Sequence, residues 1–196
     1  MTPSKTTPSL LFLVGPPAVG KMTVGHEIAR RTGFRLFHNH QTIDLVLPFF
    51  AFGTPPFVRL VEEFRRRIFE EVAASDLSGL IFTYCWAFND PKDADYVEKM
   101  AGIFRQPGGR VAFAELEATQ AERLRRNETE FRLAQKPFKR DLVHSRRNLL
   151  SADELHQLSS RGVYDGRPDY FRLDTTQLSA AQTAEQIIQR FNFPQI

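Results

Sequence analysis

An apolar run and a glycine-rich segment follow one another near the start of the chain. Residues 10–14 read LLFLV, and residues 15–23 read GPPAVGKMT. A continuous apolar run without polar alternation predicts a strand that is buried on both faces, as in a parallel sheet. The next stretch, 22–31, has apolar residues at helical spacing. Strand, glycine segment and helix therefore occur in the order of a phosphate-binding loop, whose pattern is a glycine, four residues and then Gly-Lys.

The residue types in this segment suit phosphate binding. Gly15 and Gly20 allow backbone N–H groups to turn inward, and these groups and the helix N-terminus attract phosphate oxygens, while Lys21 reaches the β- and γ-phosphates. The alternative is a glycine turn that binds nothing. The residues that we expect to contact the nucleotide are Gly15, Pro17, Ala18, Val19, Gly20, Lys21, Met22 and Thr23.

The residue after the lysine bears on the metal. Many such loops carry a Ser or Thr there that touches Mg²⁺, but this chain has Met22. A thioether does not suit a hard cation that prefers oxygen ligands. We therefore expect Mg²⁺ to rely on water, on the hydroxyl of Thr23 and on the nearby acid Asp44. Asp44 is equally compatible with the solvent face of a helix that begins near Thr42.

Length and composition indicate one ordinary globular domain. The chain has 196 residues, of which 42% are hydrophobic and 25% charged. Residues 1–9 are polar and predict a loose arm, followed by a single domain over 10–196. No apolar run approaches a membrane span or has the form of a signal peptide. A lone cysteine, Cys85, excludes a disulfide framework, so we expect a cytoplasmic protein without a membrane partner.

Positive charge is concentrated in one segment. Residues 123–147 carry nine basic and three acidic side chains, whereas the whole chain has a net charge of only +3. A local basic patch favours a phosphorylated small molecule over nucleic acid as the partner. We expect this segment to form a closing lid from which Arg126 and Arg132 contact the transferred phosphoryl group. The alternative is a solvated helix face. Supporting candidates are Lys136, Lys139 and Arg140.

Strand-like and helical stretches alternate along the whole chain. This alternation predicts a five-stranded parallel sheet with helices on both faces, that is, a three-layer α/β/α fold of the P-loop NTPase class. The expected strands are 10–14, 34–37, 80–86, 110–116 and 170–173. The expected helices are 22–31, 57–74, 93–104, 118–126, 139–158 and 179–191.

Two histidines flank an asparagine where the second strand ends. His38, Asn39 and His40 lie at the carboxyl end of that strand, where α/β proteins bind their ligands. Alternate residues of a strand share a face, so both imidazoles are expected on the same side. We expect His40 to accept or hold the proton of an acceptor hydroxyl, because an imidazole titrates near neutrality. The alternative is a hydrogen-bonded pair that shapes the pocket wall.

An aromatic segment follows the histidines directly. Residues 48–57 read PFFAFGTPPF. Such a segment lines an acceptor pocket for a partly apolar molecule, or else packs in the core or in a dimer contact. A homodimer is therefore one of the possibilities that the sequence leaves open.

The chain as a whole resembles the small P-loop kinases, the group of shikimate, gluconate and adenylate kinases. The phosphate loop, the arginine-rich segment and the closing Leu173-Asp174-Thr175-Thr176 carry the resemblance. Counted forward from the loop lysine, the positions that read Leu-Leu-Asp-Thr-Asp in shikimate kinases are 36–40 here. Histidines replace both aspartates, and Thr83-Tyr84-Cys85-Trp86 stands where shikimate kinases have three glycines. Arg59 lies near the place of their substrate-binding arginine, and Arg132 matches their mobile lid.

The resemblance implies an ATP-dependent phosphotransferase that uses Mg²⁺ and moves the γ-phosphoryl group to a hydroxyl of a small molecule. In that hypothesis the catalytic residues are Lys21, His40, Arg126 and Arg132. The acceptor would be bound by His38, Asn39, His40 and Arg59. Two alternatives remain open: a nucleoside or nucleotide kinase that stacks a base on the aromatic segment, and an ATP-binding module or weak ATPase without an acceptor.

Overall fold

The computed structural model describes residues 7–128 and 142–196. Five parallel strands form one sheet in the order β2-β3-β1-β4-β5, which confirms the predicted five-stranded parallel sheet. The strands are β1 (Ser9–Val14), β2 (Arg35–His38), β3 (Gly79–Tyr84), β4 (Val111–Glu117) and β5 (Tyr170–Asp174). β1 lies in the centre, and its Leu11 is paired with Ile81 of β3 and Ala112 of β4.

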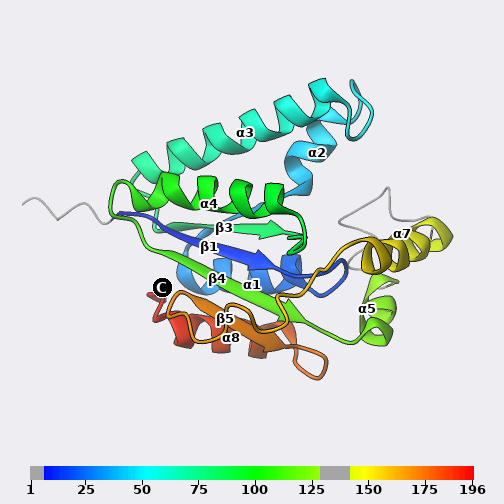
Figure 1. Cartoon of the computed structure of the whole chain (residues 1–196). Coiled ribbons are helices and arrows are strands. Elements are labelled where there is room, and N and C mark those ends of the chain that lie inside the picture. The colour runs from blue at the N-terminus through cyan, green and yellow to red at the C-terminus, as the bar shows by residue number, and fades with distance from the viewer. Residues whose placement is uncertain (1–6, 129–141) are drawn as a thin grey trace, which may run out of the picture.

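Helices cover both faces of this sheet and gather at one of its ends. The described helices are α1 (Lys21–Thr32), α2 (His40–Val46), α3 (Pro55–Ala74), α4 (Pro91–Arg105), α5 (Gln120–Asn127), α7 (Leu142–Leu155) and α8 (Ala180–Phe191). Figure 1 shows α3 and α4 over one face, and α1 and α8 over the other. The strands point toward α2, α5 and α7, so these three helices lie at the carboxyl edge of the sheet.

Two apolar layers hold the sandwich together. On the side of α3 and α4 the core is aromatic, and the Phe12 ring lies 6.2 Å from that of Phe69, 6.0 Å from Phe82 and 5.1 Å from Phe113. Under α1 and α8 the layer is mostly aliphatic, with Leu11 among its fully buried members. β1 contributes alternate side chains to both layers, which explains why its sequence shows no polar alternation.

The histidine corner differs from its prediction. β2 ends at His38, Asn39 precedes the helix, and His40 is the first residue of α2. The expectation that both imidazoles share one face of a strand is therefore wrong. The chain turns into a helix here because the Gln41 side chain accepts from the His38 N–H, and the Thr42 hydroxyl donates to the Asn39 carbonyl.

Other boundaries shift by a few residues. β1 begins at Ser9, inside the segment predicted as an arm, and residues 1–6 lie outside the described part of the chain. α3 begins two residues early, since Pro55 and Pro56 fit the first turn of a helix. Within residues 7–128 and 142–196, no helix has the length and apolar character needed to cross a membrane.

The Phe12→Ala variant should be strongly destabilised. Phe12 is fully buried among three other rings, and truncating such a side chain leaves a cavity that costs about 3–5 kcal/mol of unfolding free energy. Urea denaturation followed by circular dichroism measures this loss. The matched control is Val163→Ala, at a side chain that is 76% exposed. An equal loss in both variants would contradict the core assignment.

Candidate functional site

The glycine segment after β1 forms a tight loop that leads into α1. Gly15 (φ 133°), Ala18 (φ 62°) and Gly20 (φ 108°) all have positive φ. A Cβ on Gly15 would lie 2.3 Å from the carbonyl oxygen of Leu116 in β4. The first position therefore requires glycine both for its conformation and for its close approach to the neighbouring strand. Gly20 is the N-cap of α1, so the unpaired N–H groups of that helix face the loop.

The Lys21 ammonium folds back across the loop. Nζ donates to the carbonyls of Gly15 (2.5 Å) and Pro16 (2.8 Å), and lies 3.2 Å from Sγ of Cys85. Cys85 directly follows β3, the strand beside β1. The loop cation is thus held at the centre of the carboxyl edge of the sheet, at the place where a phosphate would meet the helix N-terminus.

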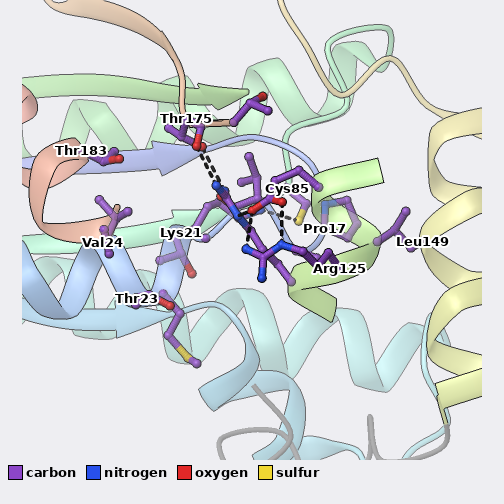
Figure 2. Close-up of a pocket in the computed structure, with 18 of the residues that line it drawn as sticks. Pro17, Lys21, Thr23, Val24, Cys85, Arg125, Leu149, Thr175 and Thr183 are labelled. Carbon is purple, nitrogen blue, oxygen red and sulfur yellow. Dashed lines mark hydrogen bonds and ion pairs between the residues drawn. The ribbon is translucent and has the colours of Figure 1, made fainter. Parts of the chain in front are cut away.

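A cavity of about 920 Å³ opens above this loop. All the nucleotide-contact candidates except Gly15 line it, namely Pro17, Ala18, Val19, Gly20, Lys21, Met22 and Thr23. Figure 2 shows Lys21 and Cys85 near the middle of the cavity, between Thr175 on one side and Leu149 of α7 on the other. One end is lined by the histidine corner, and the other by α5, α7 and the segment between β5 and α8. The phosphate loop therefore lines the same cavity as the histidine corner, α5, α7 and the segment after β5.

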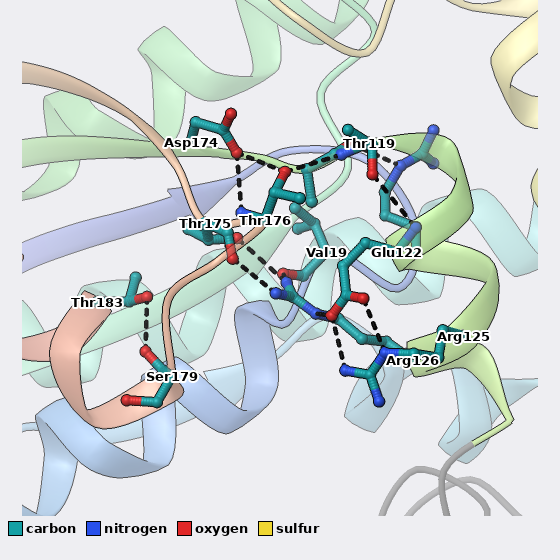
Figure 3. A network of polar contacts seen from close by, with 12 residues as sticks. Val19, Thr119, Glu122, Arg125, Arg126, Asp174, Thr175, Thr176, Ser179 and Thr183 are labelled. Carbon is teal, nitrogen blue, oxygen red and sulfur yellow. Dashed lines mark hydrogen bonds and ion pairs between the residues drawn. The ribbon is translucent and has the colours of Figure 1, made fainter.

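Arg126 ties three segments together at one end of the cavity. Its guanidinium donates to the carbonyl of Val19 (2.8 Å) and to the carbonyl and hydroxyl of Thr175 (2.6 and 3.1 Å), and its Nε donates to Glu122. Figure 3 shows this network joining α5, the loop and the end of β5. In this arrangement Arg126 borders the phosphate loop from a fixed position.

A second arginine, Arg123, links α5 to α7 and to the phosphate loop. It is buried and makes two hydrogen bonds to the carboxylate of Asp153 in α7, at 3.0 and 2.6 Å, and a longer one to the carbonyl of Pro17. Sequence reasoning counted Arg123 only as part of the basic segment, because its partner lies thirty residues away. The pair places α7 against α5, and so brings Ser145, Asn148 and Leu149 to the cavity.

His38, Asn39 and His40 all line the other end of the cavity. The N–H of Asn39 is 3.4 Å from the hydroxyl of Thr83, a buried residue near the end of β3. The structure thus brings the predicted triplet to the phosphate loop, although by a strand-to-helix turn. Arg59, in contrast, is exposed on α3 and does not line the cavity.

The arginine that holds this corner is Arg65, which sequence reasoning missed. It is only 6% exposed, and it donates to the Thr42 hydroxyl and to the Asn39 carbonyl, both at 3.0 Å. Its guanidinium also lies 5.7 Å from the centre of the Phe82 ring. The sequence does contain a signal for this arginine, because Arg65 falls at the i+4 spacing of the buried face of α3. The other residues of that face are apolar, namely Phe57, Val61, Phe69 and Ala73. A buried cation needs hydrogen-bond acceptors, and here these are the Thr42 hydroxyl and the Asn39 carbonyl at the start of α2.

The metal candidates are separated. Thr23 lines the cavity, whereas Asp44 is exposed on α2 and lies outside it. Among the described residues no group of three or more His, Cys, Asp or Glu side chains is arranged to hold a metal ion. Glu122 is the one carboxylate among the described lining residues, and both Arg125 and Arg126 bind it. Of the two metal candidates, only the Thr23 hydroxyl therefore lies in the cavity.

Most of the predicted lid lies outside the residues that the structure describes. Arg132, Lys136, Lys139 and Arg140 fall within residues 129–141, which the structure does not describe. The described parts of the segment 123–147 are the end of α5 and the start of α7.

The aromatic segment does not line the cavity. Phe49 is 75% exposed and Phe52 is 72% exposed. Phe57, the last residue of the segment, is only 4% exposed and packs with Val46 and Val61, so the core interpretation holds for Phe57 and not for the two exposed rings.

Comparison with known proteins identifies the fold. No protein-family model matches the sequence, and no curated protein matches it either. Three solved structures are similar over most of the chain. The APS kinase of Mycobacterium tuberculosis, solved with AMPPNP and APS, has a TM-score of 0.59 and 14% identity over 95% of this chain and 98% of that one. A gluconokinase from Sinorhizobium meliloti has a TM-score of 0.55 and 14% identity (95% and 93% covered).

The third is a shikimate kinase from Acinetobacter baumannii, solved with shikimate, with a TM-score of 0.52 and 19% identity over 94% of this chain and 93% of that one. At these identities the likeness concerns the fold alone. The chain therefore has the fold of the small P-loop kinases, as its resemblance implied.

The Glu122→Gln variant tests the arginine network through its pH dependence. Hydrogen bonds from Arg125 and Arg126 lower the pKa of Glu122 from 4.5 to about 2. A lowered pKa stabilises the fold above pH 4.5, and this stabilisation is lost as the pH falls through about 2. At pH 7 the free energy of unfolding of the variant should therefore be lower than that of wild type by less than about 1 kcal/mol. This difference should shrink as the pH falls toward 2.

Urea denaturation at several pH values measures this difference. Glu154→Gln, at an exposed position of α7, is the matched control and should show no such trend. A pH-independent difference for Glu122→Gln would contradict the charged network.

Proposed function

We propose that the chain is an ATP-dependent phosphotransferase that moves the γ-phosphoryl group to a hydroxyl of a small molecule. One observation carries the proposal: a single cavity is lined both by a phosphate-binding loop with its lysine and by the two imidazoles that follow β2, two strands away in the sheet. A volume of about 920 Å³ is near the upper end of ligand pockets, so a nucleotide and a small acceptor have room side by side.

The nucleotide half is built for a polyphosphate. The N-terminus of α1 and the loop N–H groups attract phosphate oxygens, and Lys21 adds a full positive charge. Beyond the loop, Arg126 and the segment from Thr175 to Ala180 border the end of the cavity where the ribose and base of ATP would lie. Electrostatic stabilisation of this kind supplies most of the catalysis in phosphoryl transfer.

Mg²⁺ neutralises phosphate charge when bound. The donor set fits an ion that keeps most of its water ligands, because Thr23 offers one hydroxyl and no described carboxylate in the cavity is free of arginine partners.

In the acceptor half of the cavity, His40 and His38 are the side chains that would handle the proton of the acceptor hydroxyl. An imidazole accepts or donates a proton near neutral pH, and so orients and deprotonates a hydroxyl without a carboxylate. Arg65 and Thr83 hold the backbone of this corner, so the imidazoles sit on a rigid turn. In the proposed reaction His40 takes the acceptor proton while the hydroxyl oxygen bonds to the γ-phosphorus and ADP leaves.

The decisive experiment measures ADP release from Mg²⁺ and ATP with and without pools of acceptors. The pools are hydroxylated small metabolites, nucleosides and nucleotides, and shikimate. Stimulation by a pool establishes a kinase, and deconvolution of that pool yields the acceptor. Stimulation by nucleosides or nucleotides alone moves the assignment to that class of kinase. ATP binding in a thermal-shift assay with no stimulation by any pool would favour a binding module or weak ATPase.

Replacing the loop lysine should abolish turnover. We expect Lys21→Ala to lower kcat by roughly 100-fold or more, because the ammonium stabilises charge on the transferred group. Lys92→Ala, at an exposed lysine of α4, is the matched control and should retain full activity. If Lys21→Ala keeps its activity and its ATP-induced thermal shift, the loop is not the nucleotide site.

Replacing His40 should slow the chemical step without weakening ATP binding. We expect His40→Ala to lower kcat by about 100-fold and to remove the acidic limb of the pH–rate profile, since that limb reports the imidazole. Exposed His156, replaced by Ala, serves as the control. Unchanged turnover in His40→Ala with the true acceptor would exclude the base.

A further inference from the structure

One negative charge lies in the cavity that the phosphate-binding loop lines. Glu122, in the first turn of α5, is the one carboxylate among the described residues of that cavity. Its pKa is lowered from 4.5 to about 2, so the side chain is ionised at neutral pH. A carboxylate in this place repels a polyphosphate unless cations neutralise it, because charges are screened less in a partly enclosed site than in bulk water. The contacts of Glu122 are therefore part of how the cavity receives an anion.

Two arginines of the same helix bind this carboxylate. Arg125 donates to both oxygens of Glu122, from Nε and from a terminal nitrogen, each at 2.7 Å. The Nε of Arg126 donates to Glu122 as well, also at 2.7 Å. A planar guanidinium that meets two oxygens side by side binds a phosphate group in the same manner. Glu122 thus occupies arginine donors that suit a phosphate.

The two arginines differ in how firmly they are held. The Arg126 side chain is 19% exposed and has further bonds to Val19 and Thr175. The Arg125 side chain is 69% exposed, and within residues 7–128 and 142–196 its guanidinium hydrogen bonds all go to Glu122. Figure 3 shows Glu122 between the two guanidinium groups, with that of Arg126 directed toward Thr175. An exposed pair of this kind contributes little to stability, so Arg125 can change partners more readily than Arg126.

We propose that Glu122 is an internal substitute for phosphate: it binds Arg125 when no nucleotide is bound, and Arg125 moves to a phosphate group of the nucleotide when one enters. The identity of that ligand rests on the proposed function. Arg125 then contributes to affinity only the difference between its new contact and the lost ion pair. Arg126 keeps its bonds to Val19 and Thr175, so the mobile phosphate contact belongs to Arg125 and not to Arg126.

Isothermal titration calorimetry with ATP and Mg²⁺ tests this exchange in single variants. We expect Arg125→Ala to bind ATP about tenfold more weakly, because it lacks a charge-assisted contact to phosphate. We expect Glu122→Gln to bind ATP about fivefold more tightly, because Arg125 no longer has an ion pair to break. Circular dichroism shows that each variant is folded.

The double variant E122Q/R125A separates the exchange from simple repulsion. If Glu122 restrains Arg125, the gain from Glu122→Gln should shrink by at least about twofold in the Arg125→Ala background. If Glu122 only repelled the nucleotide, the gain would instead grow there, because Arg125 would no longer neutralise the carboxylate. A gain that is unchanged or larger in the absence of Arg125 therefore overturns the proposal.

A matched control pair lies on α1. Arg30 and Glu27 have the same i,i+3 spacing, with 2.9 Å between nitrogen and oxygen, and neither lines the cavity. Glu27→Gln and Arg30→Ala should leave ATP binding unchanged. Inorganic tripolyphosphate is the second probe, and its affinities should follow the same pattern across the variants as those of ATP. A pattern seen with ATP alone would place Arg125 against the base or ribose, and would overturn the proposal.

Failure of the proposed function gives a different set of results. The expected pattern of ATP affinities, with no stimulation of ADP release by any acceptor pool, would overturn the phosphotransferase and keep the exchange. Stimulated ADP release, with ATP affinities that agree within about twofold among all variants, would overturn the exchange and keep the phosphotransferase. A wild-type chain that binds neither ATP nor tripolyphosphate would overturn both.

Discussion

The side chains of residues 10–14 have no contact with solvent, because β1 is hydrogen-bonded to β3 on one edge and to β4 on the other, and is covered by helices on both faces. This burial fixes where the glycine loop starts. The first glycine lies so close to β4 that a Cβ on it would be 2.3 Å from the carbonyl oxygen of Leu116, so the start of the loop packs directly against the sheet. The position of α1, of its exposed N–H groups and of Lys21 follows from that anchoring.

The two halves of the cavity are held by different kinds of contact. At the end lined by Thr175, Arg126 binds the loop and Thr175, while Arg123 binds Asp153, so α5, α7 and the segment after β5 are linked through buried or half-buried guanidinium groups. At the histidine end, Arg65 donates to the Asn39 carbonyl and the Thr42 hydroxyl, and the Asn39 N–H lies near the Thr83 hydroxyl. These contacts do not involve the phosphate loop, so substitutions in α2 can change the shape of the histidine end while the opposite end keeps its geometry.

What the sequence predicted correctly was local. The loop and its flanking strand and helix are specified by consecutive residues, so they were predicted to within one or two residues, and the alternation of elements predicted the sheet. What it missed depends on distant partners: Arg65 reaches a turn more than twenty residues earlier, and Arg123 reaches a carboxylate thirty residues later. The histidine triplet lines the cavity, but its local structure was predicted wrongly, because it spans the boundary between a strand and a helix, where both patterns fit.

The Lys21 ammonium already donates to two carbonyl oxygens and lies close to a sulfur atom, and these contacts have a consequence for selectivity among anions. A phosphate that approaches the loop must displace hydrogen bonds that are already made, so it gains only the difference between the old and the new contacts. A polyphosphate reaches more of the loop N–H groups than a single phosphate ion does, and so offsets more of this exchange. Under the proposed function, the loop would therefore favour linked phosphate groups over inorganic phosphate in the surrounding solution.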